Sequence, residues 1–138
     1  MKERVVEIYI PSELGYEKIA IAAAATVAQR MGFSPDRIEG LKTAVGEAVT
    51  NAIEHGNQST VEVKVLVELT VQEKALALNV VDQGKQPIPD LPAERDESRS
   101  PRGWGLFLIR NFMDEVNIVA KPGRNEVRMV IYLEQKSG

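Results

Sequence analysis

Several stretches of the chain have the alternating pattern or the composition of β-strands. The clearest lies at 63–71, where apolar residues at every second position alternate mainly with polar or charged ones. The other stretches are 5–10, 75–81, 116–120 and 127–133. The connections at 72–74 and 122–123 are short and typical of hairpin turns, so we expect a mostly antiparallel sheet.

Helical spacing marks three other segments. The first is expected to begin after Ser12, as N-cap, and to end at Gly32. Its predicted buried face consists of Leu14, Ile19, Ala23, Val27 and Met31. The third segment spans 103–113, with apolar residues at helical spacing.

The second helix has the strongest start signal, at 34–36. Ser34 caps, Pro35 suits the first helical position, and Asp36 meets the positive end of the helix dipole. We expect this helix to run to about His55, with Gly56 as a left-handed cap. Its predicted apolar face is Ile38, Leu41, Val45, Ala48 and Ala52.

This order of elements predicts an α+β fold, a two-layer α/β sandwich in which helices cover one face of the sheet. We expect one domain over residues 1–138. The connection at 82–102 holds four of the seven prolines, at positions 87, 89, 92 and 101. A connection of this length inside a compact domain is typical of a lid, a binding loop or a disordered segment.

Composition excludes several classes of function. The net charge of −3 gives no reason to expect binding to nucleic acid or to an anionic membrane. The chain has no cysteine and one histidine, which excludes thiol catalysis and a multi-histidine metal cage. It has no apolar run of transmembrane length and no signal-peptide core, so we expect a cytoplasmic protein. The P-loop, dinucleotide-binding, protein-kinase and nucleophile-elbow motifs are absent.

Glu47, Asn51 and His55 follow one another at intervals of four and should share one helix face. An amide oxygen can ligate magnesium, and a carboxylate can accept a proton. From the spacing alone, however, a solvated polar face is the more common explanation, and His55 alone is more often a helix-end residue favoured by the dipole.

Two glycine motifs add weaker signals. Asp82-Gln83-Gly84 follows an apolar strand, where a carboxylate can accept a hydrogen bond from an exocyclic amine, although the same motif is a common turn. Gly103-Trp104-Gly105-Leu106 begins the third predicted helix, and the free N–H groups at a helix start can bind phosphate. Arg99 and Arg102, just before it, could add charge-assisted hydrogen bonds. A flexible hinge explains the two glycines equally well.

Together, in this order, the motifs resemble those of the GHKL ATPase superfamily, and more narrowly those of bacterial anti-sigma-factor serine/threonine kinases. The matching stretches are GEAVTNAIEHGN at 46–57, VVDQGK at 80–85 and RGWGLFLIRNFMDEV at 102–116. The resemblance covers nearly the whole chain and implies the Bergerat ATP-binding fold. Two positions depart from the family pattern: Gln86 replaces a glycine, and Arg124-Asn125 replaces a Gly-Thr pair.

The resemblance implies a role for residues of each motif. Asn51 would hold Mg²⁺ on the ATP phosphates, and Glu47 would be the general base. Asp82 would accept the adenine amino group, and Gly84 would let the base approach the backbone. Arg102 would contact the γ-phosphate, residues 85–102 would form the lid, and Asn125 would lie near the water molecules on the adenine side. The remaining implied nucleotide contacts are His55 and, around the phosphates, Gly103, Trp104, Gly105 and Leu106.

The implied function is that of an anti-sigma factor and kinase. It would phosphorylate a STAS-type antagonist, sequester a sigma factor, and work as a homodimer with ATP and Mg²⁺ as cofactors. Two alternatives stay open: a partner-switching module that binds nucleotide without catalysis, and a kinase of a stress-signalling scaffold protein.

Overall fold

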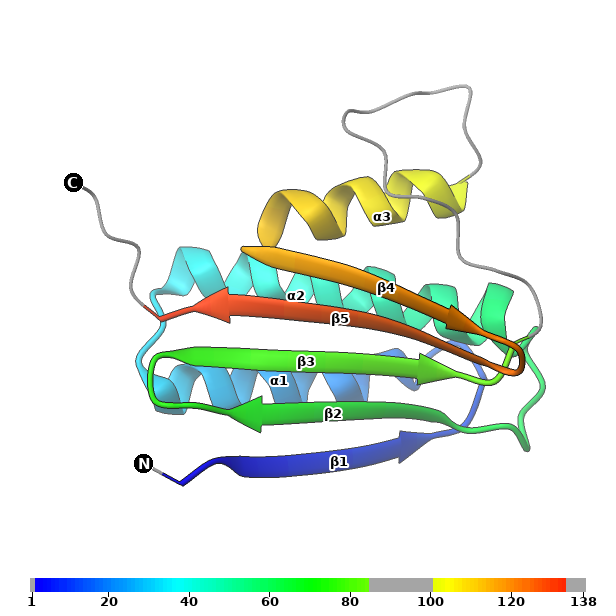
Figure 1. Ribbon diagram of the computed structural model, residues 1–138, viewed down its shortest axis with the longest axis horizontal. Coiled ribbons are helices and arrows are strands. Elements are labelled where there is room, and N and C mark those ends of the chain that lie inside the picture. Colours follow the sequence, from blue (N-terminus) through cyan, green and yellow to red (C-terminus); the bar gives the residue numbers. More distant parts are fainter. Residues whose placement is uncertain (1, 85–100, 134–138) are drawn as a thin grey trace.

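The computed structural model describes residues 2–84 and 101–133, with side chains described from 105 onward in the second range (Figure 1). The chain forms, in order, β1 (Arg4–Ile10), α1 (Glu17–Met31), α2 (Pro35–Asn51), a π-helical turn η1 (Ala52–Gly56), β2 (Val65–Val71), β3 (Ala75–Asp82), α3 (Pro101–Phe112), β4 (Glu115–Lys121) and β5 (Arg124–Tyr132). Among the described helices, none has the length and apolar character needed to cross a membrane.

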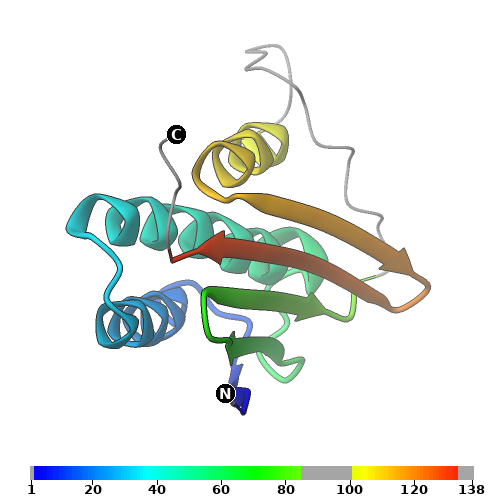
Figure 2. The same cartoon turned by 60° about the vertical axis from the view of Figure 1, so that its left-hand side comes forward.

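The strands form a five-stranded sheet in the order β1-β2-β3-β5-β4, and each neighbouring pair is antiparallel. All three α-helices lie on one face of this sheet, with α2 between α1 and α3 (Figures 1 and 2). The predicted two-layer α+β fold is therefore confirmed. The order also places β3, which ends at Asp82, at the centre of the sheet and next to β5.

The alternation in the sequence correctly predicts which strand residues face the helices. Val65, Val67 and Leu69 of β2 are fully buried, and so are Met129 and Ile131 of β5. On α2 the predicted apolar face is also confirmed, because Leu41, Val45, Ala48 and Ala52 are buried and Ile38 packs against the core. These side chains form one core between the two layers.

The predicted buried face of α1 is wrong in part, at Leu14 and Ile19. Its fully buried residues are Ala20, Ala24 and Ala28, whereas Ile19 and Leu14 are about half exposed, at 51% and 53%. α1 packs mainly against α2, and its three buried alanines belong to the core cluster. Ala23, Val27 and Met31 are partly buried and pack against this cluster.

The sequence predicts Ser12 as the N-cap of α1, and this prediction is wrong. The N-cap position belongs to Tyr16, which makes no side-chain cap bond. Ser12 is instead completely buried, and its hydroxyl donates to the carbonyl of Val63. Ser34, in contrast, caps α2 as predicted, since its Oγ accepts a hydrogen bond from the backbone N–H of Arg37 at 3.3 Å.

The end of α2 also differs from the prediction. The α-helix stops at Asn51 and continues as the π-turn η1, in which the N–H of Asn57 donates to the carbonyl of Ala52 at 2.8 Å. Gly56 does not adopt a left-handed conformation, so it is not the predicted cap. A π-turn adds one residue to a helical turn, and it therefore rotates the residues after Asn51 relative to Glu47.

A buried carboxylate lies on the face of the sheet opposite the helices. Glu126 of β5 is 3% exposed, and it receives hydrogen bonds from Asn79 at 2.9 Å, Arg124 at 2.7 Å and Arg128 at 3.0 Å. Burial alone would raise the pKa of Glu126, but these hydrogen bonds and the charge of Arg124 outweigh burial and lower the pKa to about 2.

Candidate functional site

Glu47 and Asn51 lie one turn apart near the end of α2, on the side that faces α3. Gly105 of α3 packs directly on them: a Cβ atom at Gly105 would lie 2.7 Å from Oε2 of Glu47 and 3.2 Å from Nδ2 of Asn51. Only glycine allows this approach without displacing one of the two side chains. The structure therefore brings the acid and the amide of α2 together with the second glycine of the Gly-x-Gly motif.

The electrostatic state of Glu47 suits a proton acceptor. Partial burial raises the pKa of its carboxyl above the ordinary value. A carboxylate with a raised pKa is a stronger base. The raised pKa of Glu47 is compatible with the predicted role of general base, which stays a prediction.

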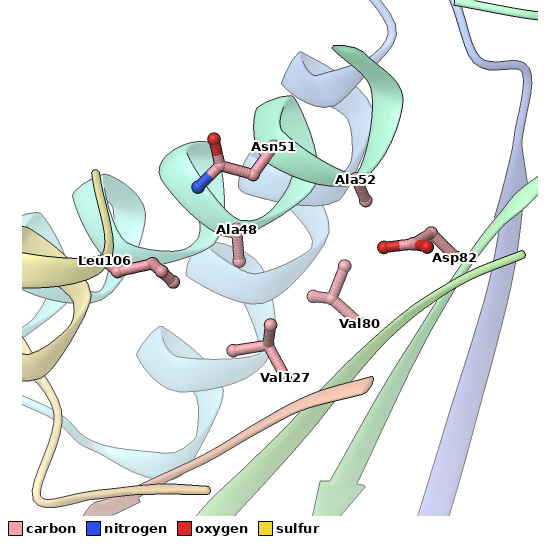
Figure 3. Close-up of a pocket in the computed structure, with 7 residues that line it drawn as sticks. All are labelled: Ala48, Asn51, Ala52, Val80, Asp82, Leu106 and Val127. Carbon is pink, nitrogen blue, oxygen red and sulfur yellow. The ribbon is translucent and has the colours of Figure 1, made fainter. Parts of the chain in front are cut away.

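Asn51 carries a buried polar atom that lacks a partner. Its Nδ2 has no hydrogen bond among the described residues. The nitrogen and oxygen of an amide are assigned from their surroundings, and a half-turn of the group would place the carbonyl oxygen at the same position. In Figure 3 the amide extends from α2 on the side of Leu106. A buried amide without a partner, beside a carboxylate, has the donor chemistry of a magnesium site that also uses ligand oxygens.

Asp82 lies at the other end of the site, at the last position of β3. It is 3% exposed, and its Oδ1 accepts hydrogen bonds from the N–H of Gly84 at 2.8 Å and from Nδ2 of Asn125 at 3.2 Å. Asn125 is paired with Asp82 across β3 and β5, and it also donates to the carbonyl of Gly84 at 3.3 Å. Asn125, which replaces the family's threonine, therefore holds Asp82 directly.

Two glycines make an unusually close backbone contact beside Asp82. A Cβ at Gly56 would lie 2.3 Å from the carboxyl carbon of Asp82, and a Cβ at Gly84 would lie 2.2 Å from the carbonyl oxygen of Gly56. A side chain at Gly56 would therefore displace the Asp82 carboxylate, and one at Gly84 would displace backbone. Gly84 was expected to make room for a base; in this structure it makes room for Gly56.

The space between these two ends is a small pocket with an apolar floor (Figure 3). It is lined by Ala48, Asn51, Ala52, Val80, Asp82, Leu106 and Val127. Its volume is about 10 Å³, close to the least that one water molecule needs. A purine ring is much larger than this space, so it would enter only if lining side chains such as Leu106, which is 1% exposed, move.

The remaining predicted site residues are placed less directly. Leu106 lines the pocket, but the side chain of His55 is exposed and does not line it. Arg102, Gly103 and Trp104 belong to the first turn of α3, but the side chains of residues 101–104 are outside the described part. Of the predicted lid at 85–102, residues 85–100 are also outside it. Their roles in nucleotide binding stay predictions.

The sequence analysis missed three features of the site. Gly56 was assigned to a helix cap, the π-turn η1 was treated as ordinary helix, and Asn57 was given no role. Asn57 is nevertheless buried, at 6% exposure, and it contacts the segment after Asp82. The available signal was the run His55-Gly56-Asn57, in which a glycine and a polar residue directly follow the apolar face of the helix.

Comparison with known proteins was made for both sequence and structure. A family model described as "Histidine kinase-like ATPase domain" matches residues 10–131. The curated relatives include the serine-protein kinase RsbW of Bacillus velezensis, 36% identical over 93% of this chain and 85% of that protein. The serine-protein kinase RsbW of Bacillus subtilis is 34% identical, with the same two coverages of 93% and 85%.

Solved structures show the same fold at lower sequence identity. A crystal structure of the RsbU and RsbW domains of Rv1364c from Mycobacterium tuberculosis matches with a TM-score of 0.71 and 18% identity, over 94% of this chain and 32% of that one. The histidine kinase domain of a blue-light-activated kinase from Erythrobacter litoralis matches with a TM-score of 0.59 and 20% identity, over 90% of this chain and 62% of that one.

Proposed function

The chain belongs to the histidine kinase-like ATPase domain family, among the serine-protein kinases of the RsbW type, and on this premise we propose that it is an ATP-dependent serine/threonine protein kinase and anti-sigma factor. The observation that carries the proposal is that Asn51 of α2 and Asp82 of β3 line one pocket, while Gly105 of α3 packs against Asn51 and Glu47 beside it. These four residues come from three motifs of the sequence, at 46–57, 80–85 and 102–116.

In the proposed complex, the two ends of the pocket bind the two ends of ATP. Asp82 accepts a hydrogen bond from the adenine amino group, with its carboxylate already oriented by Gly84 and Asn125. The backbone of the first turns of α3 binds the phosphates, since N–H groups at a helix N-terminus favour anions. The ring lies on the apolar floor formed by Ala48, Val80 and Val127.

Phosphoryl transfer then requires only a positioned hydroxyl and a base. The Glu47 carboxylate accepts the proton of a serine or threonine hydroxyl on the partner, the hydroxyl oxygen bonds to the γ-phosphorus, and the bond from the γ-phosphorus to the bridging oxygen breaks to release ADP. Mg²⁺, when bound, neutralises charge on the phosphates. Asn51 would hold this ion through its amide oxygen, one turn after Glu47.

The partners in this proposal come from the family. The hydroxyl belongs to a STAS-type antagonist of the anti-sigma factor, and the chain sequesters a sigma factor while that antagonist is phosphorylated. We further propose that the active form is a homodimer.

Incubation with labelled ATP, Mg²⁺ and a candidate STAS partner tests the kinase proposal. Phosphate should appear on the partner, and Glu47→Gln should reduce the transfer rate by at least about a hundredfold, the lower range for a general base. The matched control is Glu54→Gln, which removes an exposed carboxylate from the adjacent η1 turn and should leave transfer unchanged. Tight sigma-factor binding without transfer, or full transfer by Glu47→Gln, would contradict the proposal.

A further inference from the structure

Asn57, immediately after η1, uses its side-chain amide to join three segments that are distant in the sequence. Its Nδ2 donates to Oγ of Ser12 at 3.0 Å and to the carbonyl oxygens of Lys64 and Val63 at 3.3 and 3.4 Å. Its Oδ1 accepts a hydrogen bond from the backbone N–H of Gln83 at 2.8 Å. The side chain therefore bonds the entry of α1, the residues before β2 and the residue after Asp82.

The hydrogen bond between Asn57 and Gln83 lies directly after the last paired residue of β3. The pairing of β3 with β2 stops at Val81, and its pairing with β5 stops at Asp82. Gln83 is the next residue, and its N–H is held by the amide oxygen of Asn57 rather than by a neighbouring strand. Asn57 thus extends the ordered backbone beyond Asp82, toward Gly84.

This placement has a direct consequence for Asp82. The N–H of Gly84 is one of the donors that orient the Asp82 carboxylate, and the bond from Gln83 to Asn57 restrains the backbone that carries this N–H. On the other side, Gly56 contacts that same carboxylate and directly precedes Asn57. Asn57 therefore controls two of the groups that surround the proposed adenine acceptor.

We infer that Asn57 is a positioning residue for the adenine end of the nucleotide site, acting through the Gln83 backbone on Asp82 and Gly84. The inference rests on the proposed function, since it assumes that Asp82 binds the base. A neutral amide suits this role because it supplies a donor and an acceptor together without placing a second carboxylate next to Asp82. Such a residue governs the affinity for the base and takes no part in phosphoryl transfer.

Titration calorimetry with ATP and with ADP tests the inference on wild type, Asn57→Ala and Ser12→Ala. Asn57→Ala should raise both dissociation constants by about tenfold, the effect of one lost buried hydrogen bond, with unchanged stoichiometry. A merely destabilised protein would instead bind fewer nucleotides per chain at an unchanged dissociation constant. Ser12→Ala is the matched control: it removes a hydroxyl from the same buried network but leaves the bond to Gln83, so nucleotide affinity should stay within about twofold of wild type.

The outcomes separate this inference from the proposed function. Absence of ATP binding by the wild type would refute the proposed function itself. Wild-type binding combined with unchanged affinity in Asn57→Ala, or with equal losses in both variants, would overturn only the role of Asn57. Amide hydrogen exchange of the wild type supplies a measurement that needs no variant: the N–H of Gln83 should be protected although its side chain is exposed, and rapid exchange there would contradict the inference.

Discussion

Replacing Gly84 by alanine should lower both the free energy of unfolding and the affinity for nucleotide. The new Cβ would lie 2.2 Å from the carbonyl oxygen of Gly56, 2.7 Å from its carbon and 2.8 Å from its Cα, where ordinary contact begins at 3.4 Å. All three atoms are backbone, so no side chain can turn away, and the segments carrying Gly56 and Gly84 must separate. Overpacking of this kind costs about 3 kcal/mol, at the upper end of its usual range.

Urea unfolding measures this loss. With a slope of about 2 kcal/mol per molar urea, the midpoint for Gly84→Ala should fall by roughly 1.5 M. Nucleotide affinity should fall as well, because the displaced segments carry the groups that hold Asp82.

The matched control is Gly46→Ala, the same substitution inside α2. Its Cβ would meet only the end of the flexible Ile21 side chain, at 3.2 Å, and alanine is favoured over glycine in a helix by about 0.5–1 kcal/mol. Gly46→Ala should thus be as stable as wild type or more stable. A Gly84→Ala protein with the wild-type midpoint, or a Gly46→Ala protein that loses as much, would refute the reasoning from close backbone contact.

Other predictions concern charge and metal. Because burial raises the pKa of Glu47, the transfer rate of the wild type should fall on acidification with a midpoint above pH 4.5; a pH–rate profile with its midpoint at or below 4.5 would disagree. Hydrogen bonds lower the folded-state pKa of Glu126 to about 2, so the stability that this carboxylate contributes is complete above about pH 4.5 and is lost as the pH falls through 2. Glu126→Gln should therefore be less stable than wild type at pH 7, by only about 1 kcal/mol because Arg124 and Arg128 are half exposed and solvent weakens their ion pairs. The difference in unfolding free energy should vanish near pH 2, and a difference independent of pH would contradict this. Asn51→Ala should raise the dissociation constant of ATP about tenfold in Mg²⁺ and leave it unchanged in a chelator, as measured by calorimetry; equal effects in both would exclude a role at the metal.

The strands and α2 could be predicted because their signals are local. The alternation of apolar and polar residues in β2 and β5 indicates which residues face the core, and three consecutive residues, Ser34-Pro35-Asp36, predict where α2 begins. The face of α1 could not be predicted in this way. Alanines occupy several sides of α1, so hydrophobicity does not distinguish the closely packed side, at Ala20 and Ala24, from its border.

The errors at the site have a different cause, since they depend on contacts between distant segments. Gly56 was taken for a left-handed cap because glycines at helix ends usually are. The reason for glycine here is the carboxylate of Asp82, which only the folded chain brings next to it. In the same way, the partners of Asn57 lie in three other parts of the sequence, so no local pattern indicates its bonds. The shared helix side of Glu47 and Asn51 and the place of Asp82 at a strand end, in contrast, follow from local patterns of the sequence.

Calorimetric titration of Mg-ATP into the wild type and into Asp82→Asn tests the central claim most directly. The substitution keeps the shape of the side chain but replaces a carboxylate oxygen, an acceptor, by an NH₂ donor. We expect one ATP per wild-type chain and an affinity at least about tenfold lower for Asp82→Asn, the effect of losing a hydrogen bond to a charged group. Equal affinities in the two proteins would contradict the assignment of this pocket to ATP.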